Sequence, residues 1–235
     1  MRDTAELSLD TSGSGLHKRG YRANSNAAPL RETLAAALVK LARWRGREPF
    51  LDPFCGSGTI AIEAAMIAQR RAPGLMRAFD AEKWHCFDAS VWRQAREDAL
   101  GMADGGARFD IVGSDIDPAC VQLSIENARK AGVANTVFFE QADAAARDYT
   151  QNGVLIANPP YGERLLALQE AEALYQKMGA AMQKSPMKQY ILSSDPLFER
   201  CFGRKADKRR KLYNGMIKCE LHMYFKHSRR EIANQ

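Results

Sequence analysis

The chain has 235 residues, of which 46% are hydrophobic and 26% charged, a globular composition that excludes wholesale disorder. No stretch reaches the roughly 18 apolar residues of a transmembrane helix, and the charged N-terminus lacks the apolar core of a signal peptide. The five cysteines are scattered and form no C-x-x-C pair, so they predict reduced thiols and neither a disulfide framework nor a zinc site. We therefore expect a cytoplasmic protein that uses no membrane and no metal.

The basic excess is concentrated in one segment. The chain carries 34 Lys and Arg against 28 Asp and Glu, a net charge of +6. Residues 200–212 (RCFGRKADKRRKL) hold seven basic residues and one acid, so this segment alone accounts for the excess. A local basic cluster on a near-neutral body favours a polyanion partner, although a solvated loop has the same composition. The candidate RNA-binding residues are Arg204, Lys205, Lys208, Arg209, Arg210 and Lys211. A weaker cluster comprises His17, Lys18, Arg19 and Arg22.

The first third of the chain predicts an extension followed by the start of an α/β domain. Residues 1–26 are rich in Ser, Gly, Asn and Thr and are interpreted as an extension or linker, with the domain over 27–235. Residues 29–44 predict a helix that begins with proline and places leucines on one face. Residues 49–54 predict a strand, and the segment from residue 59 a helix with a basic last turn. Residues 71–108 interrupt the alternation and are interpreted as an insertion with a helix near 91–100.

Regular alternation then resumes. Strands are predicted within 108–116, 135–143, 153–161 and 188–195, and helices over 118–132 and 170–184. Continuous apolar runs such as VLIA are typical of parallel strands buried on both faces. Asn214-Gly215 between two β-rich runs predicts a two-residue hairpin loop. The expected fold is an open, mostly parallel α/β sheet with helices on both faces and an antiparallel hairpin at one edge.

Two glycines lie between the first strand and its helix, where α/β sheets bind ligands. Gly56, Gly58 and Ala61 fit the G-x-G-x-x-A pattern of dinucleotide-binding proteins. That interpretation needs an acid at the end of the second strand about 20 residues on. The second predicted strand ends at Asp115, which is far beyond that spacing. The pattern therefore favours a different cofactor.

S-adenosylmethionine (SAM) fits this acid-rich site better than a dinucleotide does. SAM carries no phosphate, so the turn need not bind one. Asp52 precedes the turn and suits the amino group of SAM, Asp115 suits the ribose hydroxyls, and Asp143 suits the adenine amine. The alternative for Asp117 and Asp143 is that each caps the following helix, an explanation that suits Asp117 better than Asp143. The candidate cofactor-binding residues are Asp52, Pro53, Phe54, Cys55, Gly56, Gly58, Thr59, Asp115, Ile116, Asp143, Ala144 and Asn158.

The candidate catalytic residues are Asn158, Pro159, Pro160 and Tyr161, at the end of the fourth predicted strand. The prolines remove backbone donors, so the Asn158 side-chain oxygen and the Pro159 carbonyl remain as acceptors. Two neighbouring acceptors suit the exocyclic amine of a nucleobase and can orient its lone pair toward a methyl donor. Tyr161 adds a flat face for stacking an extruded base.

DPFCGSG, SDID and NPPYGERL together resemble class I methyltransferases that act on amino groups of nucleic-acid bases. APGL, AEKW, ADKRRKLYNG and the leading LDTSGSGLHKRGYR resemble the THUMP-associated large-subunit rRNA guanine-N2 methyltransferases over nearly the whole chain. The resemblance implies a Rossmann-like fold with a seven-stranded sheet, SAM as cofactor and large-subunit rRNA as substrate. It places Asp52, Gly56 and Gly58 on the methionine part of SAM. That family also carries an N-terminal RNA-binding domain, so residues 1–26 are expected to be the stub of its linker.

Three other functions remain open from the residues alone. Asn158 to Tyr161 suit the adenine N6 amine of DNA or RNA as well as guanine N2. A catalytically silent RNA-binding module would keep the basic segment without needing Asn158 and Asp52. A nicotinamide-dependent oxidoreductase is disfavoured by the long spacing from Gly56 to Asp115.

Overall fold

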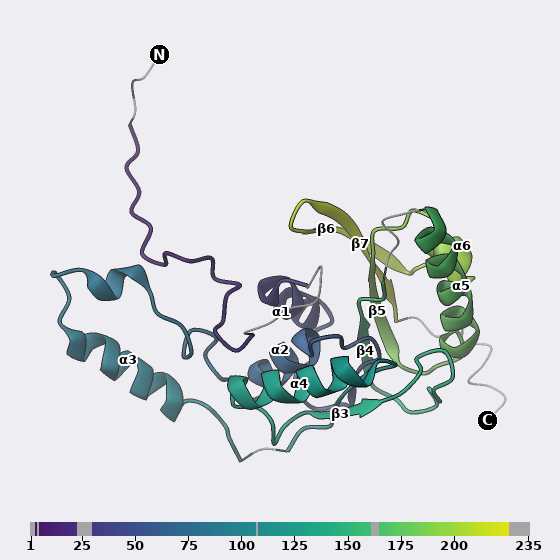
Figure 1. The fold of residues 1–235 in the computed structure, drawn as a ribbon, viewed down its shortest axis with the longest axis horizontal. Helices are drawn as coiled ribbons and strands as arrows, with labels where there is room; N and C mark the ends of the chain where they lie inside the picture. Colours follow the sequence, from purple (N-terminus) through teal and green to yellow (C-terminus); the bar gives the residue numbers. More distant parts are fainter. Residues whose placement is uncertain (1–2, 4, 23–29, 107, 161–164, 226–235) are drawn as a thin grey trace.

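A seven-stranded sheet forms the centre of the computed structural model, which describes residues 3, 5–22, 30–106, 108–160 and 165–225 (Figure 1). The strand order is β3-β2-β1-β4-β5-β7-β6, in which β1 to β5 are parallel and β7 is antiparallel to both β5 and β6. The elements are α1 (Glu32–Leu41), β1 (Phe50–Asp52), α2 (Thr59–Ala68), the 3₁₀ helix η1 (Asp80–Lys83), α3 (Ala89–Gly101), β2 (Ile111–Asp115), α4 (Pro118–Ala131), β3 (Phe138–Gln141), β4 (Val154–Ala157), α5 (Leu165–Met182), β5 (Lys188–Ser193), α6 (Phe198–Phe202), β6 (Lys208–Asn214) and β7 (Ile217–Tyr224). The predicted fold class is confirmed.

Helices cover both faces of the sheet and bury it in two separate cores (Figure 1). Residues of α1, α2 and α4 pack on one face, and residues of α5 and α6 pack on the other. All four residues of β4 are buried, as the apolar run VLIA predicts for a central parallel strand. Helix α2 is nearly all small or apolar residues and is buried over eight of its ten positions, which brings the turn before it close to the sheet.

The hairpin at the sheet edge forms one residue later than predicted. Asn214 is the last residue of β6 and pairs with Ile217, so the two-residue loop is Gly215-Met216. Gly215 has φ of 63°, which suits a loop whose first residue must adopt a left-handed conformation. Helix α2 also differs from its prediction: it ends at Ala68, and no basic residue lies in its last turn.

Part of the predicted N-terminal extension packs on the domain. The Arg77 guanidinium donates to the carbonyls of Ser12, Ser14 and Gly15, and Tyr21 is 1% exposed in the core. Chain packing therefore begins before residue 27, because Tyr21 fills a core position that composition did not reveal.

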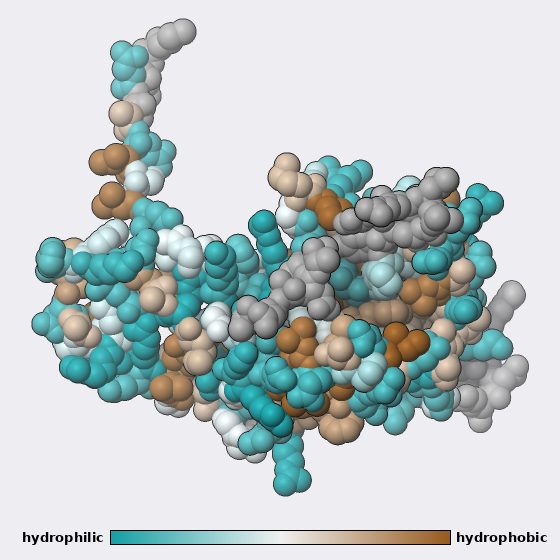
Figure 2. Space-filling model, in the orientation of Figure 1, coloured by the Kyte–Doolittle hydropathy of each residue, from teal (hydrophilic) through white to brown (hydrophobic). Residues whose placement is uncertain are grey.

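The region over residues 71–108 contributes no strand within its described residues, and its η1 and α3 stand away from the sheet at the left of Figure 1. Helix α3 has no buried residue. Apolar surface is exposed on this region and on the N-terminal segment (Figure 2). The exposed apolar residues there are Leu7, Leu9, Met76, Phe87, Val91, Leu100 and Met102.

Across the described residues, none of the helices combines the length and apolarity needed to cross a bilayer. Within the same part of the chain, no group of three potential metal ligands comes together.

Candidate functional site

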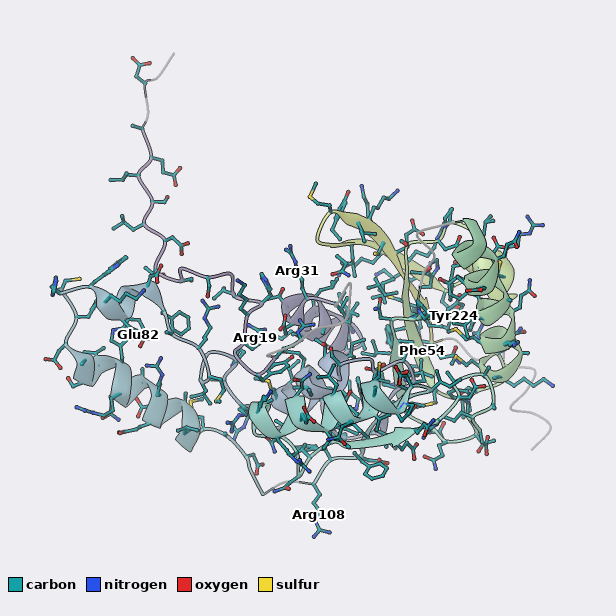
Figure 3. The ribbon with its side chains drawn as sticks, viewed as in Figure 1. Arg19, Arg31, Phe54, Glu82, Arg108 and Tyr224 are labelled. Atoms are coloured by element: carbon teal, nitrogen blue, oxygen red, sulfur yellow. The ribbon has the colours of Figure 1, made fainter. Side chains whose placement is uncertain are left out.

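The carboxyl ends of β1, β2, β3 and β4 surround a cavity of about 400 Å³, a size typical of small-molecule sites. The strand order reverses between β1 and β4, and open α/β sheets bind ligands at such a point. Phe54, labelled in Figure 3, lies at this edge between the helices of the two layers. The cavity is lined by Leu30, Pro53, Phe54, Cys55, Gly56, Ser57, Thr59, Ile60, Asp115, Ile116, Cys120, Asp143, Ala144, Asn158, Pro160 and Leu174.

The glycine turn forms the floor of the cavity. Gly56 has φ of 53°, a left-handed conformation that favours glycine, and a Cβ there would meet open space. This glycine therefore allows the turn conformation and lets a ligand approach the backbone closely. Gly58 has φ of 80°, and a Cβ on it would lie 3.0 Å from the Phe139 ring and from Ser124 Cβ. Gly58 therefore allows α2 to pack closely on the sheet and does not itself line the cavity.

Asp115 ends β2 and reaches across to the glycine turn. Its Oδ2 accepts the Gly56 N–H at 2.9 Å, and its Oδ1 accepts the Asp117 N–H at 3.0 Å. Each carboxylate oxygen keeps a second lone pair for a ligand hydroxyl. Asp117 instead accepts the Ala119 N–H at 2.8 Å and caps α4, which matches the structural explanation offered for it.

The candidate adenine end of the cavity contains one acid and two apolar residues. Asp143 lines the cavity, and its Oδ1 accepts the Ala145 N–H at 2.8 Å, so it both stabilises a turn and presents an oxygen to the site. Ala144 is buried, while Ile116 lines the cavity with 65% of its surface exposed. An apolar side chain left open at a cavity mouth is suited to cover the face of an aromatic ligand ring.

Asp52 lies beneath the turn and is fully buried, without forming part of the cavity wall. Its Oδ1 accepts the Phe54 N–H at 3.3 Å, while its Oδ2 is buried without a hydrogen-bond partner among the described residues. Burial raises the pKa of Asp52 to about 8, with a smaller contribution from the nearby Asp115 charge and against the opposing effect of the Phe54 hydrogen bond. Burial also raises the pKa of the neighbouring Cys55 thiol, which keeps that thiol protonated.

Replacing Asp52 by Asn should change how stability depends on pH. The native carboxyl holds a proton up to about pH 8, whereas the unfolded one ionises near the ordinary aspartate pKa of 3.8. Unfolding therefore releases a proton in this range, and wild-type stability falls relative to Asp52→Asn as pH rises, by at most about 1.4 kcal/mol per pH unit. The difference should level off above pH 8. Urea denaturation of both proteins at pH 5, 6.5 and 8 measures it, and parallel stability curves would contradict the assignment.

The loop after β4 presents an open acceptor. Asn158 and Pro160 line the cavity, and Asn158 Oδ1 is buried without a hydrogen-bond partner among the described residues. Pro159 is buried and does not form part of the wall. Tyr161 lies outside the described residues. A buried carbonyl oxygen without a partner is costly unless a ligand donor fills it, which makes Asn158 the clearest ligand-seeking group at the site.

The second half of the basic segment is an edge strand, and residues 203–207 before it connect α6 to that strand. Lys208, Arg209, Arg210 and Lys211 all lie on β6, with their side chains exposed. The Arg209 guanidinium contacts Glu220 at 3.4 Å and Glu199 at 3.9 Å. Arg204 lies just before the strand, over the Tyr224 ring at 5.2 Å, and Lys205 is exposed beside it. The cluster therefore follows one edge of the sheet, and basic residues on such an edge also discourage edge-to-edge association.

The second basic cluster serves the fold. Arg19 pairs with Glu63 of α2 at 3.3 Å, and Arg22 pairs with Glu32 of α1 at 2.7 Å. Both carboxylates are buried, so each needs its arginine partner inside the protein. Neither arginine is therefore a good candidate for a phosphate contact.

Several cavity residues carry no signal in the sequence patterns. Leu30, Ile60, Cys120 and Leu174 line the cavity from α1, α2, α4 and α5 or the segments next to them. Their spacing marks them only as helix-face residues. No motif signals that the fold brings them together at this edge of the sheet.

Comparison with known proteins identifies the chain. The family model UPF0020, described as the RMKL-like methyltransferase domain, matches residues 19–223. The chain belongs to this family. YpsC of Bacillus subtilis, named as a candidate RNA methyltransferase, is 46% identical over 229 residues, which cover 96% of this chain and 59% of YpsC. Ribosomal RNA large subunit methyltransferase K/L of Vibrio parahaemolyticus is 41% identical over 95% of this chain and 33% of its own length.

One solved structure with a similar fold contains a cofactor product. SMU.472, described as a candidate methyltransferase complexed with S-adenosylhomocysteine (SAH), superposes with a TM-score of 0.86 and 43% identity, covering 93% of this chain and 58% of its own. The family match establishes a methyltransferase domain. The chain spans less than two thirds of each of these relatives, so substrate and partners are questions for the next section.

Proposed function

We propose that this UPF0020 domain transfers a methyl group from SAM to an exocyclic base amine of RNA, namely guanine N2 of large-subunit rRNA. The buried, unpartnered Asn158 Oδ1 at the cavity wall carries the proposal, because an amine N–H would supply its missing donor. The neighbouring acids at the ends of β2 and β3 suit a nucleoside cofactor. The prediction of SAM as cofactor thus agrees with the geometry.

SAM supplies a methyl group activated by its sulfonium charge. Asp115 would accept hydrogen bonds from the ribose hydroxyls, for which its carboxylate retains free lone pairs. Asp143 would accept from the adenine amine, with Ile116 and Ala144 covering the ring. Gly56 leaves open space for the methionine part beside the turn. Asp52 would act from beneath, as a neutral carboxyl whose Oδ1 holds the Phe54 N–H and so supports the shape of the turn.

Asn158 and Pro159 would position the amine. The Asn158 side-chain oxygen and the Pro159 carbonyl can accept both amine hydrogens, which turns the nitrogen lone pair toward the methyl group. Catalysis of this kind depends on orientation and needs no strong base. Tyr161 stays a proposed stacking partner for the extruded base.

The names of the relatives favour rRNA as the substrate. Either amine fits the same two acceptors, so guanine N2 is proposed over adenine N6 on the resemblance of ADKRRKLYNG and the leading segment to guanine-N2 methyltransferases. An rRNA substrate would place the domain in the cytoplasm, where ribosomes assemble.

The test of the proposed function has two steps. Mass spectrometry of the purified protein should find bound SAM or SAH. Nucleoside analysis of rRNA lacking the modification should then find N2-methylguanosine. N6-methyladenosine would instead support the alternative, and the absence of both products would refute both proposals.

The basic residues on and before β6 are proposed to contact RNA phosphates. Lys208, Arg210 and Lys211 point from the exposed edge strand, and Arg31 at the start of α1 lies beside the hairpin loop (Figure 3). Arg209 is the weakest candidate, because Glu199 and Glu220 already accompany it. Arg204 and Lys205 extend the same edge.

Replacing Lys208 and Arg210 by glutamine should make RNA binding less dependent on salt. The slope of log K against log salt concentration should become smaller by roughly 0.7–0.9 for each phosphate that is no longer neutralised. A matched control replaces Arg129 and Lys130, two exposed basic residues at the end of α4, and should leave the slope unchanged. Filter binding between roughly 50 and 300 mM salt measures both slopes. Equal slopes for wild type and the β6 variant would assign these residues to edge protection alone.

A further inference from the structure

Tyr175 joins the proposed amine-binding loop to the body of the protein. Its side chain is completely buried on α5, and its ring meets the Phe198 ring edge-on, with centroids 5.0 Å apart. The hydroxyl donates to the Pro160 carbonyl at 3.0 Å and lies 3.5 Å from Ser193 Oγ at the end of β5. One hydroxyl thus links the loop after β4 to the carboxyl end of the adjacent strand.

The loop needs an anchor of this kind. Pro159 and Pro160 have no N–H, so backbone hydrogen bonds can hold them only through their carbonyls. The Tyr175 bond uses the Pro160 carbonyl, while Asn158 Oδ1 is left without a partner among the described residues. The loop is therefore held at one end while its acceptor stays open.

A buried tyrosine hydroxyl needs a hydrogen-bond acceptor, and the other buried tyrosines find theirs away from the Asn158–Pro160 loop. Tyr149, Tyr190 and Tyr224 bond the carbonyls of Ala144, Ala42 and Arg204, none of which belongs to the Asn158–Pro160 loop. Tyr175 alone among these four bonds that loop. The Phe198 contact fixes its ring, so the direction of the hydroxyl is set by packing.

We propose that the Tyr175 hydroxyl is a positioning group for methyl transfer, which fixes Pro160 and thereby the placement of the Asn158 and Pro159 acceptors on the target amine. The inference rests on the proposed function. It adds a residue that touches neither cofactor nor substrate and acts through the loop.

The first test is Tyr175→Phe, which keeps the ring and its Phe198 contact. With SAM and unmodified rRNA, kcat should fall roughly 10- to 100-fold, as expected for a small displacement of reacting groups. The Kd for SAH should stay within about twofold, because Tyr175 does not line the cavity. Tyr190→Phe, which removes a hydroxyl bonded to Ala42 at 3.4 Å, is the matched control and should keep wild-type kcat.

A double-mutant cycle separates positioning from simple destabilisation. Asn158→Asp keeps an acceptor and residual turnover, and adding Tyr175→Phe should then cost much less than in the wild-type background, since both changes act on one loop. Single-turnover rates and thermal midpoints are measured for all four proteins. An unchanged kcat in Tyr175→Phe, or fully multiplicative effects, would overturn the inference while leaving the proposed function standing. A wild-type chain that transfers no methyl group to a base amine would overturn both.

Discussion

Asn158→Ala should abolish methyl transfer while leaving cofactor binding nearly intact. The Asn158 side-chain oxygen is buried at the cavity wall without a partner among the described residues, so its unmet requirement is a substrate donor. Loss of an orienting acceptor should lower kcat about 100-fold or more. Radiolabelled methyl transfer to rRNA and calorimetric titration with SAH measure the two properties.

Asn158→Asp is the informative companion variant. Aspartate keeps an oxygen in nearly the same place, so a positioning role predicts activity between that of the wild type and that of Asn158→Ala. Normal turnover in Asn158→Ala would remove the residue from the amine site. Loss of SAH binding in the same variant would instead assign it to the cofactor.

Asp115→Ala should weaken cofactor binding by roughly 10- to 150-fold. The carboxylate lines the cavity and is oriented by two backbone N–H groups, and a hydrogen bond to a charged group contributes about 1.5–3 kcal/mol. The substitution also frees the Gly56 N–H and loosens the turn. Calorimetric titration with SAM and SAH measures the change, which should be similar for both because both carry the ribose.

Asp117→Ala is the matched control for that experiment. Asp117 lies two residues away, caps α4 and does not line the cavity. Its removal should cost about 1 kcal/mol of stability and leave the Kd unchanged. Equal losses of affinity in the two variants would show that Asp115 acts by supporting the local backbone rather than by contacting the ribose.

Local patterns in the sequence were enough for most of the strands and helices and for the acidic strand ends, although they gave no prediction of the short helix α6. VLIA predicts the buried strand β4, and the glycines between β1 and α2 predict the turn, because each depends on residues within a few positions. The fold class follows from the alternation of such segments. Alternation also brings Asp115, Asp143 and Asn158 to one edge, since parallel strands end on the same side of a sheet.

Long-range packing decided where several of the predicted site and basic residues lie. The sequence predicts Asp52 in the cofactor site, but its carboxyl is buried beneath the turn, since β1 lies between β2 and β4 at the centre of the sheet. Arg19 and Arg22 resemble a basic patch in sequence, yet each meets a buried glutamate 44 or 10 residues away. Within the basic segment 200–212, residues 208–212 belong to an edge strand because β6 pairs with β7, a partner that lies outside the segment. Tyr175 reaches Pro160 only because α5 folds back over the sheet, and no local pattern records contacts that tertiary packing creates.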